Sequence, residues 1–191
     1  MSQRGGAEPP TPRRRTATRH GGRFASVTDR DAIVPEPDRV ATASHSVPFD
    51  PALVIPHRAP FLFVSEVTAV DPGRAARGTW HVGAEEWFFS GHFPGRPTLP
   101  GVLMVESLAQ LGAVAVLLDD RFNSKLPLFG GIERARFRRQ VVPGETLDLE
   151  VELNRLSARG GKGKGRASVG GATCAEAELL FVVVDASVVT Q

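Results

Sequence analysis

Residues 99–118 read LPGVLMVESLAQLGAVAVLL, an apolar run that continues almost without a break. Pro100 and Gly101 stand at its beginning, and proline fits the first turn of a helix because its missing N–H would have no partner there. The acidic pair Asp119-Asp120 follows the run. This pattern predicts a helix from about Gly101 to the acidic pair. A helix that is apolar on nearly every side belongs inside a protein core.

The length of the run also fits a membrane-spanning helix, which needs about 20 apolar residues. Glu106, Ser107 and Gln110 lie inside the run, however, and Pro100 lies at its edge. Ionisable and polar groups are costly in the middle of a bilayer, so these residues argue against a membrane span. We therefore expect a helix buried in the core of the protein.

Shorter apolar segments on both sides of this helix are separated by turn residues, which is typical of strands. A short helical or extended opening at residues 61–64 leads into a strand that ends near Val70. The other predicted strands cover residues 74–82, 128–140, 146–156, 165–169 and 175–184, with turns at residues 71–73, 143–144, 159–164 and 170–171. Short turns imply an antiparallel sheet. We predict an α+β domain in which this sheet wraps around one long central helix.

The chain of 191 residues divides by composition into a tail, residues 1–45, and one domain, residues 46–191. The tail is rich in Arg, Pro, Thr and Gly and has few large apolar side chains, so it is expected to be disordered. It carries eight arginines against five acidic residues. The rest of the chain has 15 basic and 16 acidic residues, a net charge of −1. The domain therefore offers no overall positive charge for binding nucleic acid.

The chain has one cysteine, Cys174, which cannot form an intramolecular disulfide and cannot build a zinc site with a second thiol. A reducing compartment suits such a chain, so we expect it in the cytoplasm. The sequence shows no metal-ligand cluster and no dinucleotide-binding glycine pattern. We expect neither a bound metal nor a bound cofactor.

Two titratable residues are candidates for acid-base chemistry. Glu106 lies inside the predicted buried helix, where a carboxylate needs a partner or a function because removing its charge from water is costly. Gln110 follows at i+4 on the same helical face. His92 lies in the stretch FFSGHFPG, residues 88–95, a rigid loop that can hold an imidazole in place. Taken alone, each has a structural explanation, as a loop histidine or as a capping or bridging carboxylate.

The start of the predicted helix at Gly101 adds a backbone N–H that could polarise a carbonyl group. An acid-base pair together with such a donor forms a recognisable catalytic set. The set by itself does not name a substrate.

Four stretches carry a resemblance to a known family. They are IPHRAPFLFV at residues 55–64, FSGHFPGRP with LPGVL and ESLAQ at residues 89–110, GIERARFRR with VPG at residues 131–144, and the segment at residues 163–178. In this order they resemble the beta-hydroxyacyl-acyl carrier protein dehydratases of the FabZ type. The spacing between His92 and Glu106 is similar to that of the family's catalytic histidine and glutamate. Related FabA-like enzymes have aspartate at the second position, so glutamate favours dehydration without isomerisation of the double bond.

This resemblance implies a hot-dog fold and a dimer in which His92 of one subunit meets Glu106 of the other. It implies a lyase that converts (3R)-hydroxyacyl thioesters on acyl carrier protein to trans-2-enoyl thioesters in fatty-acid, polyketide or polyene biosynthesis. His92 is then expected to take the α proton, and Glu106 to position or protonate the leaving hydroxyl. The N–H of Gly101 is expected to bind the thioester carbonyl, with Gln110 and Phe93 against the substrate.

A row of arginines is expected to bind the acidic carrier protein whose phosphopantetheine arm brings the substrate. The row consists of Arg134, Arg136 and Arg138, which alternate along a predicted strand, and the neighbouring Arg139. The alternative is a solvated strand face with local salt bridges to Glu133 or Glu145.

Two other functions stay open at this point: a catalytically silent hot-dog subunit that partners an active paralogue, and a hot-dog acyl thioesterase. The chain departs from the family pattern in having Ser65 where aspartate is usual, in lacking tyrosine and in its long tail. These departures concern the substrate range. Acyl length is not defined by the sequence, nor is the choice between a homodimer, a higher oligomer of dimers and a heterodimer with a paralogue.

Overall fold

The computed structural model describes residues 47–188, and the predicted tail lies outside these residues. The described part contains one α-helix, α1 (Gly101–Leu117). Its strands are β1 (Glu66–Asp71), β2 (Ala75–His81), β3 (Lys125–Phe137), β4 (Thr146–Ser157), β5 (Gly160–Val169) and β6 (Ala172–Asp185). Short 3₁₀ helices are η2 (Pro51–Leu53), η3 (Trp87–Ser90), η4 (Asp120–Phe122) and η5 (Ala186–Val188).

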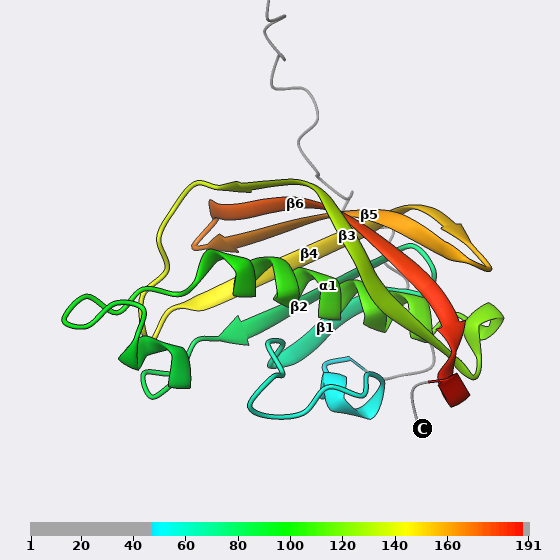
Figure 1. Ribbon diagram of the computed structural model, residues 1–191, viewed down its shortest axis with the longest axis horizontal. Helices are drawn as coiled ribbons and strands as arrows, with labels where there is room; N and C mark the ends of the chain where they lie inside the picture. Colours follow the sequence, from blue (N-terminus) through cyan, green and yellow to red (C-terminus); the bar gives the residue numbers. More distant parts are fainter. Residues whose placement is uncertain (1–46, 189–191) are drawn as a thin grey trace, which may run out of the picture. The chain divides into compact units, whose positions relative to one another are not determined.

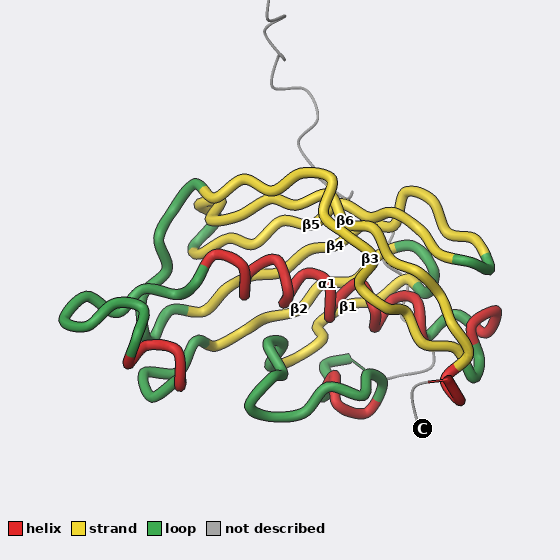
Figure 2. Tube along the Cα trace, in the orientation of Figure 1, coloured by secondary structure: helices red, strands yellow, loops and turns green. Residues whose placement is uncertain are grey.

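The strands form one sheet in the order β1-β2-β4-β5-β6-β3, and each neighbouring pair is antiparallel. Figure 1 shows α1 lying along one face of this sheet, which curves around it, and the tube in Figure 2 shows the same arrangement. β1 and β3 form the two edges. The predicted α+β architecture, with an antiparallel sheet around one helix, is confirmed.

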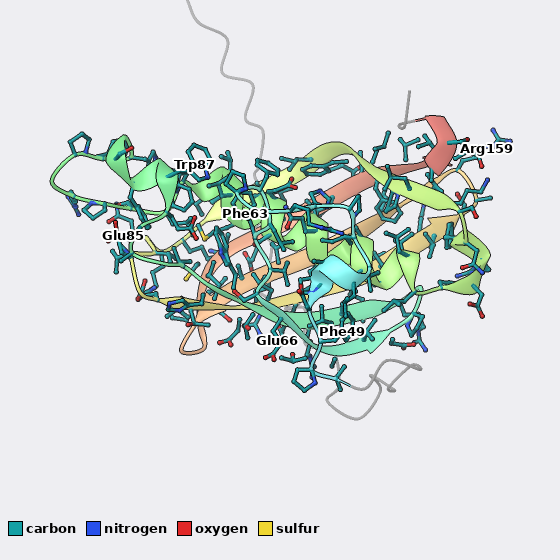
Figure 3. The ribbon with its side chains drawn as sticks, turned by 90° about the horizontal axis from the view of Figure 1, so that it is seen from below. Phe49, Phe63, Glu66, Glu85, Trp87 and Arg159 are labelled. Atoms are coloured by element: carbon teal, nitrogen blue, oxygen red, sulfur yellow. The ribbon has the colours of Figure 1, made fainter. Side chains whose placement is uncertain are left out.

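The core lies between α1 and the sheet, and α1 contacts all six strands. Leu108 and Leu111 of α1 are fully buried, as expected for a helix without a polar face. Phe63, from the segment before β1, packs its ring 5.0 Å from that of Trp80 in β2, and Figure 3 shows Phe63 in the interior. The segment at residues 61–64 is thus tied to the core although it forms neither helix nor strand.

The predicted helix boundaries are confirmed, since α1 begins at Gly101 and ends two residues before the acidic pair. The Asp119 carboxylate accepts a hydrogen bond from the backbone N–H of Arg121 and so caps the 3₁₀ helix that follows. Hydrogen bonds from the Arg121 side chain hold the pKa of Asp119 below its ordinary value. Within residues 47–188, no helix combines the length and the apolar character needed to cross a membrane.

Four predicted strand boundaries were wrong. β3 and β6 each begin three residues earlier than predicted, at Lys125 and Ala172. β5 begins at Gly160, although its glycine-rich first half was predicted to be a turn. A Cβ atom on Gly161 would lie 2.3 Å from the backbone oxygen of Arg155 and 2.5 Å from the ring of Phe181, so glycine here permits close packing inside the sheet. β3 ends at Phe137, three residues earlier than predicted, so Arg138 and Arg139 lie beyond the strand.

Candidate active site

His92 lies in the loop that connects η3 to α1. Its backbone N–H donates to the carbonyl oxygen of Phe88 at 2.9 Å, and its own carbonyl accepts from the N–H of Thr98 at 2.9 Å. The next residue, Leu99, donates to the carbonyl of Val141 at 2.8 Å. These bonds close the loop on itself and attach it to the segment after β3, so the backbone of His92 is held on both sides.

The hydrogen bond of the His92 ring defines which nitrogen can act as a base. Nδ1 lies 2.7 Å from the carbonyl oxygen of Thr98. A carbonyl oxygen only accepts hydrogen bonds, so Nδ1 carries the proton in the neutral ring and Nε2 has the free lone pair. The ring of the following residue, Phe93, stacks on the imidazole at a centroid distance of 4.0 Å. His92 therefore presents Nε2 as a base in a fixed orientation.

Gly101 is the first residue of α1, and Pro100 before it provides no side-chain cap for the helix. A Cβ atom at position 101 would lie 2.9 Å from the ring of Phe137 in β3. Glycine therefore lets the helix start approach the Phe137 ring closely, and a larger residue would displace this ring. The positive end of the helix dipole lies at this point, where it favours a developing negative charge.

Glu106 lies in the second turn of α1, with its side chain 18% exposed. Gln110, one turn further and buried, donates from Nε2 to Oε1 of Glu106 at 3.0 Å. The same amide donates to the carbonyl of Phe61 at 3.2 Å and accepts from the N–H of Phe63 at 2.8 Å. Both N–H groups and the oxygen of the Gln110 amide are thus used. They connect the 61–63 segment to α1 and bond to the Glu106 carboxylate.

A cavity of about 190 Å³ extends from Glu106 along α1. Its polar lining comes from Glu106, Gln110 and His57. The rest of its lining is mostly apolar and includes Val116 at the end of α1 and Leu128 of β3. A carboxylic acid at one end of an apolar cavity can give or take a proton at one end of a molecule whose other end is a hydrocarbon.

The described chain does not place all the predicted site residues together. Glu106 and Gln110 line the cavity, whereas His92, Phe93 and Gly101 are not among its lining residues. Phe93 is 54% exposed on the loop of His92. In one copy of the chain, the candidate base His92 and the helix start at Gly101 are thus not part of the cavity lining to which the candidate acid Glu106 belongs.

His57 lines the cavity but was not predicted from the sequence as a site residue. Its Nε2 lies 3.8 Å from Oε1 of Glu106, and its side chain is 30% exposed. The sequence signal was a titratable residue between Pro56 and Pro60, in a segment noted only for its family resemblance. Its relation to Glu106 depends on that segment folding back against α1, which residue spacing does not reveal.

Comparison with known proteins gives a match to one family. The model of the FabA-like domain family matches residues 55–178. The chain belongs to this family. A 3-hydroxyacyl-[acyl-carrier-protein] dehydratase FabZ of Moorella thermoacetica is 57% identical over 130 residues, which cover 68% of this chain and 91% of that protein. A protein of the same name from Pelotomaculum thermopropionicum is 55% identical over 68% of this chain and 93% of its own length.

Solved structures share the fold of this FabA-like chain at low sequence identity. The dehydratase heterocomplex ApeI:P from Xenorhabdus doucetiae matches with a TM-score of 0.57 and 18% identity, covering 73% of this chain and 93% of that one. A sigma28-regulated virulence protein from Campylobacter jejuni matches with a TM-score of 0.54 and 13% identity, covering 70% and 84%. The predicted family and the hot-dog fold are thereby confirmed.

The four predicted carrier-binding arginines of this FabA-like chain separate into two pairs. Arg138 forms an ion pair with Glu176 at 2.6 Å, and Arg139 forms one with Glu145 at 2.5 Å. The hydrogen bonds from Arg139 hold the pKa of Glu145 below its ordinary value.

The other pair lies on β3, with Arg134 opposite Glu178 and Arg136 opposite Glu176 in the register with β6. Both side chains are exposed, and the structure records no ion pair for either within residues 47–188. Glu133, which the sequence offered as a partner for these arginines, pairs with Lys162 instead.

Proposed function

We propose that the chain is a 3-hydroxyacyl-[acyl-carrier-protein] dehydratase of fatty-acid biosynthesis, which removes water from a (3R)-hydroxyacyl thioester to give a trans-2-enoyl thioester. The observation that carries the proposal is Glu106 at the end of an apolar cavity, within a FabA-like domain whose relatives bear this enzyme name. The buried single cysteine, Cys174, suits a cytoplasmic enzyme.

Dehydration needs a base for the α proton and an acid for the β hydroxyl. Nε2 of His92 takes the α proton, since Nδ1 is engaged with Thr98. The electron pair of that C–H bond forms the double bond, and the C–O bond breaks as Glu106 protonates the leaving hydroxyl. The N–H of Gly101 binds the thioester oxygen, where such a donor typically contributes about 3–4 kcal/mol in the transition state.

The two halves of the site come together in a dimer. β3 is an edge strand of 13 residues that exposes large apolar side chains, among them Phe129, Ile132 and Phe137. Long apolar edge strands are usually covered, because their free N–H and C=O groups pair with another chain. A second copy on this edge brings His92 of one copy toward Glu106 of the other, and a two-fold dimer has two such sites.

The reaction is tested by giving the purified chain a 3-hydroxybutyryl thioester and following enoyl absorbance and free thiol separately. A dehydratase produces enoyl absorbance without free thiol. Release of thiol without enoyl product would instead identify a thioesterase. No change in either signal would identify a silent subunit, and both of these outcomes contradict the proposal.

A separate prediction concerns the carrier protein, for which Arg134 and Arg136 are the two of the four predicted arginines that are exposed on β3 without a recorded ion pair in the described range. Replacing both by Gln removes two positive charges without placing like charges opposite Glu178 and Glu176. We expect KM for carrier-bound substrate to rise about fivefold or more at low ionic strength, and less in high salt, because such charges act on association. Steady-state kinetics at two salt concentrations measure this.

The matched control is Arg159→Gln, at the turn before β5. The sheet register places Gly160 opposite Val182, whereas Arg136 lies opposite Glu176, so the control lies well away along β6. In Figure 3, Arg159 lies at the opposite end of the domain from Trp87. A short N-acetylcysteamine thioester should be turned over equally by all variants. Equal losses on both substrates would assign the arginines to the fold rather than to the carrier.

A further inference from the structure

His57 and Glu106 are the two titratable side chains that line the cavity within the described residues. Nε2 of His57 lies 3.8 Å from Oε1 of Glu106, which is longer than a direct hydrogen bond but within range of a dipole or charge. Oε1 also accepts the hydrogen bond from Gln110 at 3.0 Å. Two side chains from different parts of the chain therefore face the same carboxylate oxygen.

The two ring nitrogens of His57 have different surroundings. Its Nδ1 is buried and has no hydrogen-bond partner among the described residues. A proton on Nδ1 would be a buried N–H without an acceptor, which is costly. The Arg58 guanidinium donates to the carbonyl of His57 at 2.7 Å and to that of Ile55 at 2.8 Å, which fixes the backbone that carries the ring.

The neutral ring has a single N–H, and its place follows from the same contacts. On Nδ1 it would be a buried donor without an acceptor, which is rare in folded proteins. On Nε2 it lies on the nitrogen that is 3.8 Å from Oε1 of Glu106. The tautomer with the proton on Nε2 is therefore favoured.

We propose that His57 is a positioning residue that acts with Gln110 on Glu106. Both present an N–H to Oε1, so this oxygen stays an acceptor and Oε2 carries the proton that is given to the leaving hydroxyl. The Oε2–H bond breaks as the new O–H bond of water forms, and the proton that His92 takes from the α carbon returns to Glu106 through solvent. The inference rests on the proposed dehydration and adds a role for a third side chain.

Other charged groups near His57 and Glu106 are few. The segments of β3, β4, β5 and β6 that line the cavity contribute no charged side chain to it. On the loop, Arg58 faces the backbone of His57, and on α1 the neighbour of Glu106 is the uncharged Gln110. In the proposed dimer, His92 of a second copy faces Glu106 across the substrate.

The test replaces His57 by Phe, which keeps a ring without a donor, and by Gln, whose amide can offer an N–H near the place of Nε2. We expect His57→Phe to lower kcat about tenfold or more while KM stays within about twofold, because ground-state binding is unchanged. His57→Gln should keep kcat within about threefold of the wild type.

The control variant is His81→Phe, an exposed histidine of β2 whose ring contacts Thr146 at 3.2 Å, and it should behave as the wild type. A wild-type kcat in His57→Phe would overturn the proposal. An equal loss in His57→Gln would overturn it too, because an N–H donor at this place would then not be what Glu106 needs.

A measurement on the wild-type protein needs no variant to fold. Nitrogen-15 NMR should show the neutral ring of His57 as the tautomer protonated on Nε2, and the tautomer protonated on Nδ1 would contradict the inference. This readout is independent of turnover. A wild-type protein that fails to dehydrate its substrate would refute the proposed function, while the NMR result would still decide the state of His57.

Discussion

Glu106→Gln and His92→Ala are each expected to lower kcat for dehydration by about 10²- to 10⁴-fold, the usual contribution of one proton-transfer group. Glutamine keeps the shape of Glu106 and an oxygen that can accept the hydrogen bond from Gln110, so the loss reflects the missing proton alone. Alanine at position 92 removes Nε2 and leaves the backbone bonds of the loop to Phe88 and Thr98. Enoyl absorbance under saturating substrate measures the effect.

The matched control for Glu106→Gln is a glutamate outside the site. Glu85→Gln changes an exposed glutamate in the loop before η3, labelled in Figure 3, and should retain wild-type turnover. Each variant should keep the wild-type circular dichroism spectrum and melting temperature. Turnover within about threefold of wild type in Glu106→Gln or His92→Ala would remove that residue from the proposed chemistry, since a proton-transfer group contributes far more than this.

Residues close together in the sequence were sufficient to predict the helix and most strands. The boundaries of α1 follow from Pro100, Gly101 and the acidic pair, each of which acts within one helical turn. The start of β5 could not be predicted in this way. Its glycines fit close packing against Phe181, which is distant in sequence and comes near only when the sheet forms.

The site shows the same division between local and distant causes. His92 and Glu106 were predicted from residue types and family spacing, and their catalytic roles stay predictions. His57 was missed because it comes near Glu106 only when its segment of the chain folds against α1. The hydrogen bond from the N–H of Phe63 to Gln110, which lies 47 residues later in the sequence, ties this segment to the helix. The ion pair of Arg139 with Glu145 was foreseen as an alternative, whereas the pairing of Arg138 with Glu176 depends on the register of β3 with β6.

Mixing the inactive His92→Ala and Glu106→Gln proteins is expected to restore activity. In one copy of the chain, the cavity with Glu106 does not include His92, and we propose that a complete site draws on two copies. A mixed dimer then has one site with both substitutions and one site with neither. Random exchange of subunits makes half of the dimers mixed, each with one of two sites intact, so about a quarter of wild-type activity should return.

The recovery has to depend on subunit exchange. Activity should therefore appear over time after mixing, or at once if the two proteins are denatured and refolded together, and each variant treated alone should stay inactive. The exposed apolar side chains of β3, such as Ile132 and Phe137, are the surface on which we propose that the copies pair. Mixed dimers demonstrated by mass spectrometry that remain inactive would mean that His92 and Glu106 act within one copy, and the shared site would have to be abandoned.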